Sequence, residues 1–369
     1  MVLTATEIGK SRMYRHRDHY EFCLAILWER ILNIQDVSIY DGFFELGGAE
    51  ESAEAMLAGL TDEFGVEVPA GLFAAEPTIE ATAALVREGR IARGAAQRPT
   101  WVPGADPAAL PLVLLPTVEG EITFLYRILC SSEIGRPMLG LRSQGLDLED
   151  QPLTTVDAIV DRYIADLDAA GVGEPYLISG VSSSAVIAFA MAQRLEQSGK
   201  RVAYLGLFEP PPVHGFQYDV QDLVDFYLAD VCSMADIEYS RERREICIRR
   251  LKELGEFPSD YSTELVMRMA EVNALNYRAA DVYQPRGRFG GHAVFYESRE
   301  ANCGTEPVGK LADATAAGRT YEQFWLRHLL PQTLVRRQNC AHRGLHNSRE
   351  TRVFIREDIE NGIRELRAF

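Results

Sequence analysis

The feature that most limits the fold is an alternation of apolar strands and amphipathic helices that begins at Leu110. The strand-like runs are "LPLVLLPT", "RPMLGLRSQG", "PYLISG" and "RVAYLGLFE", and the helical patterns include "LTTVDAIVDRYIADLDAAG" and "SAVIAFAMAQRLEQSGK". Such alternation predicts a mostly parallel sheet with helices on both faces, and continuously apolar strands are typical of a sheet buried on both sides. We therefore expect an α/β domain over residues 110–369.

An insertion interrupts this pattern at about residues 214–283. It contains three helical patterns, "DVQDLVDFYLADVCSMA", "SRERREICIRRLKELG" and "STELVMRMAEVNALNYRAADVY", and no strong strand. Strand patterns return in "GHAVFYES" and "QTLVRRQN", and the chain closes with the amphipathic helix "RVFIREDIENGIREL". We expect the insertion to lie over the sheet.

The N-terminal part has a different character. Residues 17–88 contain helical patterns in "YEFCLAILWERIL", from about Glu51 to Glu63, and in "PTIEATAALVREGR", which predict a small helical domain. Residues 89–109 are rich in Gly, Pro and Ala and show neither helical nor strand periodicity. We interpret them as a linker between two domains.

Composition excludes several classes of function. Lys and Arg number 38 against 54 Asp and Glu, a formal charge of -16, which disfavours nucleic acid or an anionic membrane as a partner. No signal-peptide or membrane-spanning pattern is present, so a cytoplasmic location is expected. The cysteines are scattered and lack the spacing of a zinc or redox motif, so no metal site is predicted: Cys23, Cys130, Cys232, Cys247, Cys303 and Cys340.

The strongest chemical signal is "YLISGVSSSAVIAFAMA", in which an apolar strand ends in Gly180-Val181-Ser182-Ser183-Ser184 and a helix begins at once. A serine on such a turn presents its hydroxyl at the sheet edge, beside amides that can stabilise an oxyanion. The usual pattern is G-x-S-x-G, and Ser184 replaces its second glycine. On this stretch alone, Ser182 is either a nucleophile or a polar helix cap.

Chain order then points to an acid and a base, because in folds with this turn the serine is followed by an acid and then by a histidine. Glu209 ends the buried strand "RVAYLGLFE" and is the candidate acid; the alternative is a solvated loop residue. The late loop "QNCAHRGLHNSRETRVFI" offers His342 and His346. We choose His342 because it lies nearer the end of the preceding strand.

The expected chemistry is acyl transfer. His342 takes the proton from Ser182 as the serine attacks an acyl carbonyl, with the acid orienting the imidazole. The expected oxyanion donors are the amides of Ser183 and Val118, the latter in the loop after "LPLVLLP". Glu119 lies beside Val118, and its carboxylate would oppose the developing negative charge if it pointed inward.

With these motifs in place, nearly the whole chain resembles the carrier protein and thioesterase of a nonribosomal peptide synthetase or polyketide synthase. The resemblance rests on "VSIYDGFFELGG", "FGVEVP" and "PTIEATAALV", then on "PLVLLPTVEG", "SGVSSSAVIAFAMAQRLEQSGKRVAYLGLFE" and "VNALNYRAADVYQP". It implies a small four-helix carrier-like domain followed by an α/β hydrolase with a helical lid. The implied reaction releases an acyl or peptidyl chain from a pantetheine thioester to water or to an internal nucleophile. The implied triad is Ser182, Glu209 (usually Asp) and His342, with Val118 and Ser183 as oxyanion amides.

The carrier-like domain departs from its family at one decisive position. In "FFELGGAEESAEAM" the serine that would carry phosphopantetheine is replaced by Glu50, and the spacing to Phe64 shows no insertion that would bring Ser52 into its place. A shift of two residues turns a helical side chain by about 200°. We therefore expect no covalent pantetheine, and a substrate presented by another carrier, on an upstream synthetase module or an acyl carrier protein. An engineered replacement is the alternative to natural loss.

Two other functions remain as competing hypotheses. One is a non-catalytic docking or interaction didomain, suggested by Glu50, Glu119 and the altered turn around Ser182. The other is an acyltransferase or ester-forming enzyme that uses the same serine with an alcohol or amine acceptor. Retention of all three triad groups in the expected order favours the thioesterase.

Overall fold

The structure is a computed structural model, and it describes the following parts of the chain: residues 16–91, 99–102, 106–117, 119–125, 133–146, 148, 150–213, 215–216, 218–298, 324–340, 345 and 348–368. Contacts divide the chain into two compact units. The first joins Met1–Ala96 to Arg249–Ser262, and the second joins Gln97–Ile248 to Thr263–Phe369. In the part of the chain that is described, no helix combines the length and the apolarity that crossing a membrane requires.

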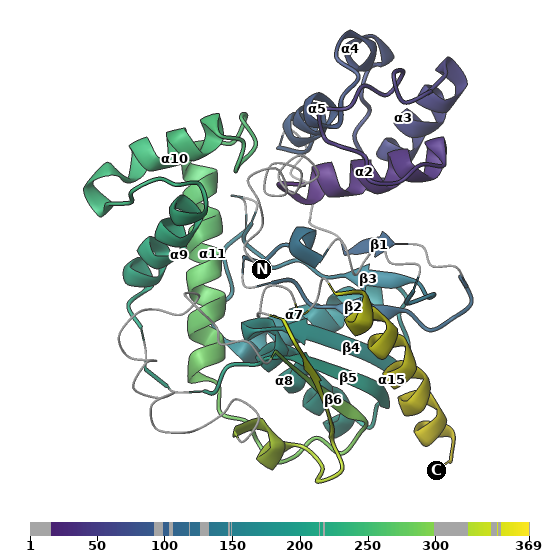
Figure 1. Ribbon diagram of the computed structural model, residues 1–369, viewed down its shortest axis with the longest axis vertical. Helices are drawn as coiled ribbons and strands as arrows, with labels where there is room; N and C mark the ends of the chain where they lie inside the picture. Colours follow the sequence, from purple (N-terminus) through teal and green to yellow (C-terminus); the bar gives the residue numbers. More distant parts are fainter. Residues whose placement is uncertain are drawn as a thin grey trace. The chain divides into compact units, whose positions relative to one another are not determined.

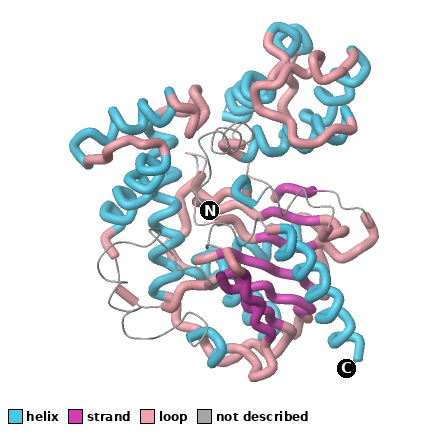
Figure 2. Tube along the Cα trace, in the orientation of Figure 1, coloured by secondary structure: helices cyan, strands magenta, loops and turns pink. Residues whose placement is uncertain are grey.

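The second unit is built on a sheet whose described strands have the order β1-β3-β2-β4-β5-β6-β7 (Figures 1 and 2). Its strands are β1 (Thr100–Val102), β2 (Leu112–Leu114), β3 (Met138–Gly140), β4 (Tyr176–Val181), β5 (Val202–Phe208), β6 (Ala293–Ser298) and β7 (Leu334–Gln338). Every pairing from β3 to β7 is parallel, and β1 alone among these strands is antiparallel to its neighbour. The predicted mostly parallel sheet is confirmed.

Helices cover both faces of this sheet. Leu205 of β5 belongs to the apolar core formed with α7 (Val156–Ala169) and α8 (Ser183–Gln197). The adjacent Tyr204 points to the other face, where its hydroxyl bonds that of Tyr296 at 3.0 Å. Tyr296 in turn donates to Asp358 of α15 (Arg349–Ala368) at 2.9 Å. Because successive strand residues face opposite sides, these contacts place α8 and α15 on opposite faces of the sheet.

Residues 100–102, assigned above to the linker, form β1. Thr100 and Val102 are buried and Trp101 is exposed, so this short edge strand does alternate. Three residues are too few to give a detectable periodicity, and the strand exists because it pairs with β3. The linker prediction was also too early at its start, because α5 (Ile79–Ile91) continues past residue 89.

The insertion is helical, as expected. Its helices are α9 (Val220–Met234), η2 (Arg241–Arg243), α10 (Arg244–Glu253) and α11 (Thr263–Val282). Helix α11 packs against α9 and α8, and its buried residues include Val266, Ala270 and Val272. One stretch of the insertion, Arg249–Ser262, groups with the first unit instead.

The first unit contains α2 (His19–Leu32), α3 (Glu50–Phe64), α4 (Ala70–Ala75) and α5. Its core is aromatic: the ring of Phe43 lies 4.9 Å from that of Trp28 and 5.5 Å from that of Phe73, both edge to face. A Cβ at Gly48 would lie 2.3 Å from the Phe43 ring. Packing therefore requires the second glycine of the Gly47-Gly48 pair, whether or not the loop presents a serine.

An ion network, buried at Arg87 and Asp18 but exposed at Asp260, attaches the stretch Arg249–Ser262 to these helices. Arg87 of α5 donates to both carboxylate oxygens of Asp260 at 2.6 Å and to Asp18 at 2.7 Å. The Tyr261 hydroxyl donates to the same Asp18 oxygen at 2.9 Å. Asp18 also accepts from the Glu21 amide and so caps α2. Sequence reasoning missed this network because Arg87 and Asp260 are 173 positions apart.

We expect Gly362→Ala to destabilise the second unit. A Cβ at this position of α15 would lie 1.9 Å from the backbone oxygen of Ala203, and backbone cannot yield as a side chain does. The expected loss is about 1–3 kcal/mol, measured by urea denaturation. Gly173→Ala is the control, because a Cβ there meets nothing within 4 Å. Equal stability of the two variants would contradict close packing of α15 on β5.

We expect Asp260→Ala to loosen residues 254–262. The substitution removes both bonds to Arg87 but leaves the bond between Arg87 and Asp18. Amide hydrogen exchange in this segment should rise about tenfold, as expected when a charged hydrogen bond worth about 1.5 kcal/mol is lost. Glu242→Gln in exposed η2 is the control and should leave exchange unchanged. Unaltered exchange in Asp260→Ala would show that the segment is held by other contacts.

Candidate active site

Ser182 occupies a strained turn between β4 and α8. Its backbone dihedrals are φ 54° and ψ -129°, a conformation that costs a non-glycine residue about 1–3 kcal/mol. Its amide donates to the Phe208 carbonyl at 2.8 Å, and its carbonyl accepts from the Ala185 amide at 2.9 Å. Its side chain makes no cap hydrogen bond to the helix. The geometry is that of a presented hydroxyl and does not support a helix cap.

The turn also explains the first glycine of the motif. A Cβ at Gly180 would lie 2.5 Å from the Ser184 carbonyl oxygen and 2.8 Å from the Ala185 nitrogen. The first turn of α8 therefore approaches β4 too closely for any side chain at this position.

Glu209 is buried at the end of the next strand, so the interpretation as a solvated loop residue is wrong. Its exposure is 3%, and its own backbone has a positive φ of 44°. Val181 and Phe208 are register partners in the parallel pair β4–β5, so Ser182 and Glu209 directly follow paired residues. Both therefore leave the sheet at its carboxyl edge, side by side.

Ser298, the last residue of β6, holds the Glu209 carboxylate. The Ser298 amide donates to Glu209 Oε1 at 2.8 Å, and its hydroxyl donates to the same oxygen. The Glu209 amide donates to the Tyr296 carbonyl at 3.0 Å, which fixes the backbone as well. Sequence reasoning missed Ser298, although its place at the end of the apolar run "GHAVFYES" was a usable signal.

His342 and His346 lie outside the described residues, so the choice between them stays a prediction. The ends of their loop are described: β7 ends at Gln338, and the Ser348 hydroxyl donates to Gln338 Oε1 at 2.8 Å. Since β6 and β7 are parallel, the loop starts at the same sheet edge as Ser182.

Of the two predicted oxyanion donors, Ser183 is described and Val118 is not. Ser183 is the buried first residue of α8, where backbone amides have no partner within the helix. The loop around Val118 is held on both sides, because the Thr117 amide donates to the Glu121 carbonyl at 3.0 Å and the Gly120 amide to the Thr117 carbonyl at 2.8 Å.

The acidic character of this loop is partly neutralised. Glu121, only 5% exposed, forms a two-bond ion pair with buried Arg142, at 3.1 Å and 2.5 Å. Glu119 is half-buried. The Ser143 amide donates to the Gly120 carbonyl at 3.0 Å, which ties the loop to the end of β3. Arg142 was not singled out from the sequence, because a lone arginine after a strand has no distinctive pattern.

The start of α3, where the sequence predicts a carrier attachment position, has Glu50 and a hydrogen-bonded Ser52. Glu50 is the exposed first residue of α3, where the helix dipole favours a negative charge. The Ser52 hydroxyl accepts from the Ala49 amide at 2.7 Å and donates to the Ala49 carbonyl at 2.8 Å. The Ser52 hydroxyl is therefore engaged in the start of the helix.

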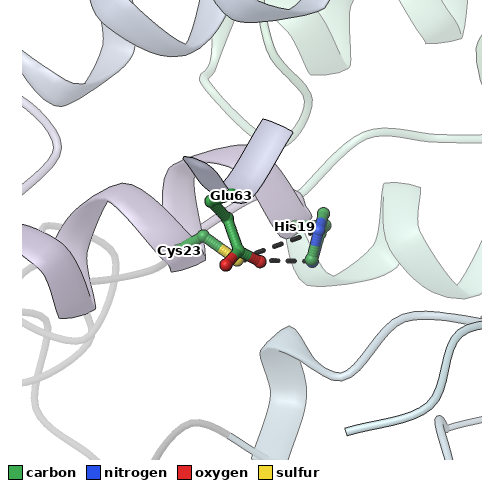
Figure 3. Close-up of side chains that lie close together, drawn as sticks. All are labelled: His19, Cys23 and Glu63. Atoms are coloured by element: carbon green, nitrogen blue, oxygen red, sulfur yellow. Dashed lines mark hydrogen bonds between the residues drawn. The ribbon is translucent and has the colours of Figure 1, made fainter. Parts of the chain in front are cut away.

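The helical unit contains a group of ligand-type side chains (Figure 3). Atoms of His19, Cys23 and Glu63 all lie within 4.8 Å of one another. The Cys23 sulfur is almost equidistant from the two ring nitrogens of His19, at 3.6 Å and 3.8 Å. A metal shared by a thiolate and an imidazole would bring the sulfur close to one nitrogen only. We therefore assign no metal to this group.

Comparison with known proteins identifies the second unit. A family model described as "Thioesterase domain" matches residues 110–356. An indigoidine synthase of Streptomyces lavendulae is 30% identical over 51% of this chain and 14% of its own length. A nonribosomal peptide synthetase of Aspergillus terreus is 27% identical over 65% of this chain and 25% of its own length. The chain thus spans a quarter or less of these relatives.

A solved four-domain nonribosomal peptide synthetase, bound to AMP and glycine, has a similar fold. It superimposes with a TM-score of 0.70 and 19% identity, over 94% of this chain and 26% of that one. The predicted α/β-hydrolase fold, preceded by a helical region, is confirmed. Because the matched family segment covers more than half of the 369 residues, the chain belongs to the thioesterase domain family.

Proposed function

We propose that this chain is a chain-releasing thioesterase with Ser182 as its nucleophile. The observation that carries the proposal is the strained Ser182 turn with a buried, hydrogen-bonded Glu209 beside it at the same sheet edge. A carboxylate that is buried and held at this position is suited to orient an imidazole. Membership in the thioesterase domain family and the synthetase relatives support the same reaction class.

In the proposed reaction Ser182 Oγ bonds to the acyl carbon of a pantetheine thioester and gives its proton to His342. The amides of Ser183 and Val118 stabilise the oxyanion that forms. The C–S bond then breaks, and His342 returns the proton to the departing thiolate. Water, activated by the same histidine, releases the acid and regenerates the serine. An internal hydroxyl or amine in place of water gives a macrocycle.

Glu209 keeps the imidazole in the tautomer that accepts the serine proton, and it stabilises the imidazolium that results. The contact with Ser298 supports this role because it limits the carboxylate to one orientation. An acyltransferase would use the same groups with an external alcohol or amine, and product analysis separates it from hydrolysis.

We also propose that the helical domain carries no phosphopantetheine. Glu50 offers no hydroxyl, and Ser52 is bonded at the start of α3. The acyl chain would then arrive on the pantetheine arm of another carrier, from an upstream synthetase module or a separate carrier protein. The synthetase relatives support this source of substrate.

We expect Ser182→Ala to lower hydrolysis of an octanoyl thioester of N-acetylcysteamine by about 10⁴-fold or more, because the nucleophile is lost. Labelling by a serine-directed fluorophosphonate should disappear in the same variant, as seen by intact-protein mass spectrometry. Ser179→Ala, which removes a buried hydroxyl within β4, is the control and should still be labelled. Undiminished labelling of Ser182→Ala would contradict the proposed nucleophile, and an unlabelled, inactive wild type would favour a docking role.

We expect no pantetheine mass gain when the wild-type protein is incubated with coenzyme A and a phosphopantetheinyl transferase. The matched variant Glu50→Ser restores a hydroxyl at the first residue of α3 and should gain one pantetheine group. A gain by the wild type that is lost in Ser52→Ala would overturn this interpretation of the helical domain.

A further inference from the structure

The replacement of the second motif glycine by Ser184 has a structural counterpart at the end of β4. The last bond between β2 and β4 runs from the Leu115 amide to the Ser179 carbonyl at 2.9 Å. Alternate residues of a parallel strand bond to the same neighbour, so Val181 directs its amide and carbonyl to the β2 side as well. The next donor along that chain, the Thr117 amide, turns away and bonds Glu121 instead.

Ser184 provides the hydrogen-bond partners that the chain after β2 does not offer to Val181. Its hydroxyl oxygen accepts from the Val181 amide at 3.0 Å and donates to the Val181 carbonyl at 2.9 Å. The Ser184 side chain therefore provides both the acceptor and the donor that a neighbouring strand would otherwise provide. Ser184 is only 2% exposed, so without the hydroxyl two buried backbone groups would lose their partners.

This contact borders the strained residue directly. The positive φ of Ser182 persists only if the chain on both sides is held. The Ala185 amide bonds the Ser182 carbonyl, and the Phe208 carbonyl of β5 accepts from the Ser182 amide. The Ser184 hydroxyl bonds the amide and carbonyl of Val181. With Val181 bonded to Ser184, the Thr117 amide bonds the Glu121 carbonyl and not the end of β4.

We propose that Ser184 is a positioning residue for the nucleophile: its hydroxyl replaces a strand neighbour and fixes the turn that presents Ser182. The proposal rests on the proposed role of Ser182. Ser184 is not a second nucleophile, because its hydroxyl is enclosed and bonded as both donor and acceptor. It acts through Ser182 and does not contact the acyl chain.

The test compares Ser184→Ala with Ser179→Ala. Both remove a buried serine hydroxyl from the same region, but the Ser179 hydroxyl bonds the Gly206 carbonyl within the sheet and does not border the turn. We expect Ser184→Ala to lower kcat for the octanoyl thioester and the fluorophosphonate labelling rate by about tenfold, a typical effect of misplacing a reacting group. KM should stay within about twofold, and the midpoint of the kcat–pH profile should not move, because the base is untouched.

Ser184→Cys keeps a side chain of similar shape with a much weaker donor and acceptor, and it should lower kcat in the same direction. Ser184→Thr keeps the hydroxyl and should restore most of the rate. The proposal is overturned if Ser184→Ala retains kcat within twofold, or if Ser179→Ala loses kcat equally at equal thermal stability. A wild type that is neither active nor labelled would refute the role of Ser182 itself, which is a different result.

Discussion

The register between β4, β5 and β6 is the constraint on which the rest of the site depends. Val181 pairs with Phe208, and Phe208 pairs with Tyr296, so the three strands end together at one edge. The backbone bonds continue one residue beyond each strand, from the Ser182 amide to Phe208 and from the Glu209 amide to Tyr296. A slip of one residue would turn every strand side chain to the opposite face and would separate Ser182 from Glu209.

The fold and the residues of the turn at Ser182 could be predicted from the sequence because local patterns specify both. Buried strands, amphipathic helices and a glycine followed by serine at a strand end need few neighbours to be recognised. Sequence reasoning missed β1 and Arg142 because their roles depend on partners distant in the chain, and it missed Ser298 although the end of an apolar run was a local signal. The choice of His342 over His346, made from the distance to the preceding strand end, stays a prediction because both histidines lie outside the described residues.

Several polar groups near the carboxyl edge of the sheet have protein partners. Ser298 holds Glu209, Arg142 neutralises Glu121, and Ser184 completes Val181. Each of these contacts fixes a turn whose backbone would otherwise be free to relax. The proposed reaction benefits from such contacts, because hydrogen-bond donors that are already fixed can stabilise charge as it develops on a substrate.

The attachment of Arg249–Ser262 to the first unit changes where the chain can be divided. A cut or a swap in the stretch between α5 and β1 would remove the helices but leave behind the segment that bears Asp260 and Tyr261. Arg87 would then lose its bonds to Asp260, and Asp18 its bond to Tyr261. The segment left in the insertion would expose the surface that these helices cover. The helical unit consequently cannot be exchanged as one continuous piece of chain. A chimaera that keeps its contacts must transfer Arg249–Ser262 together with the N-terminal helices.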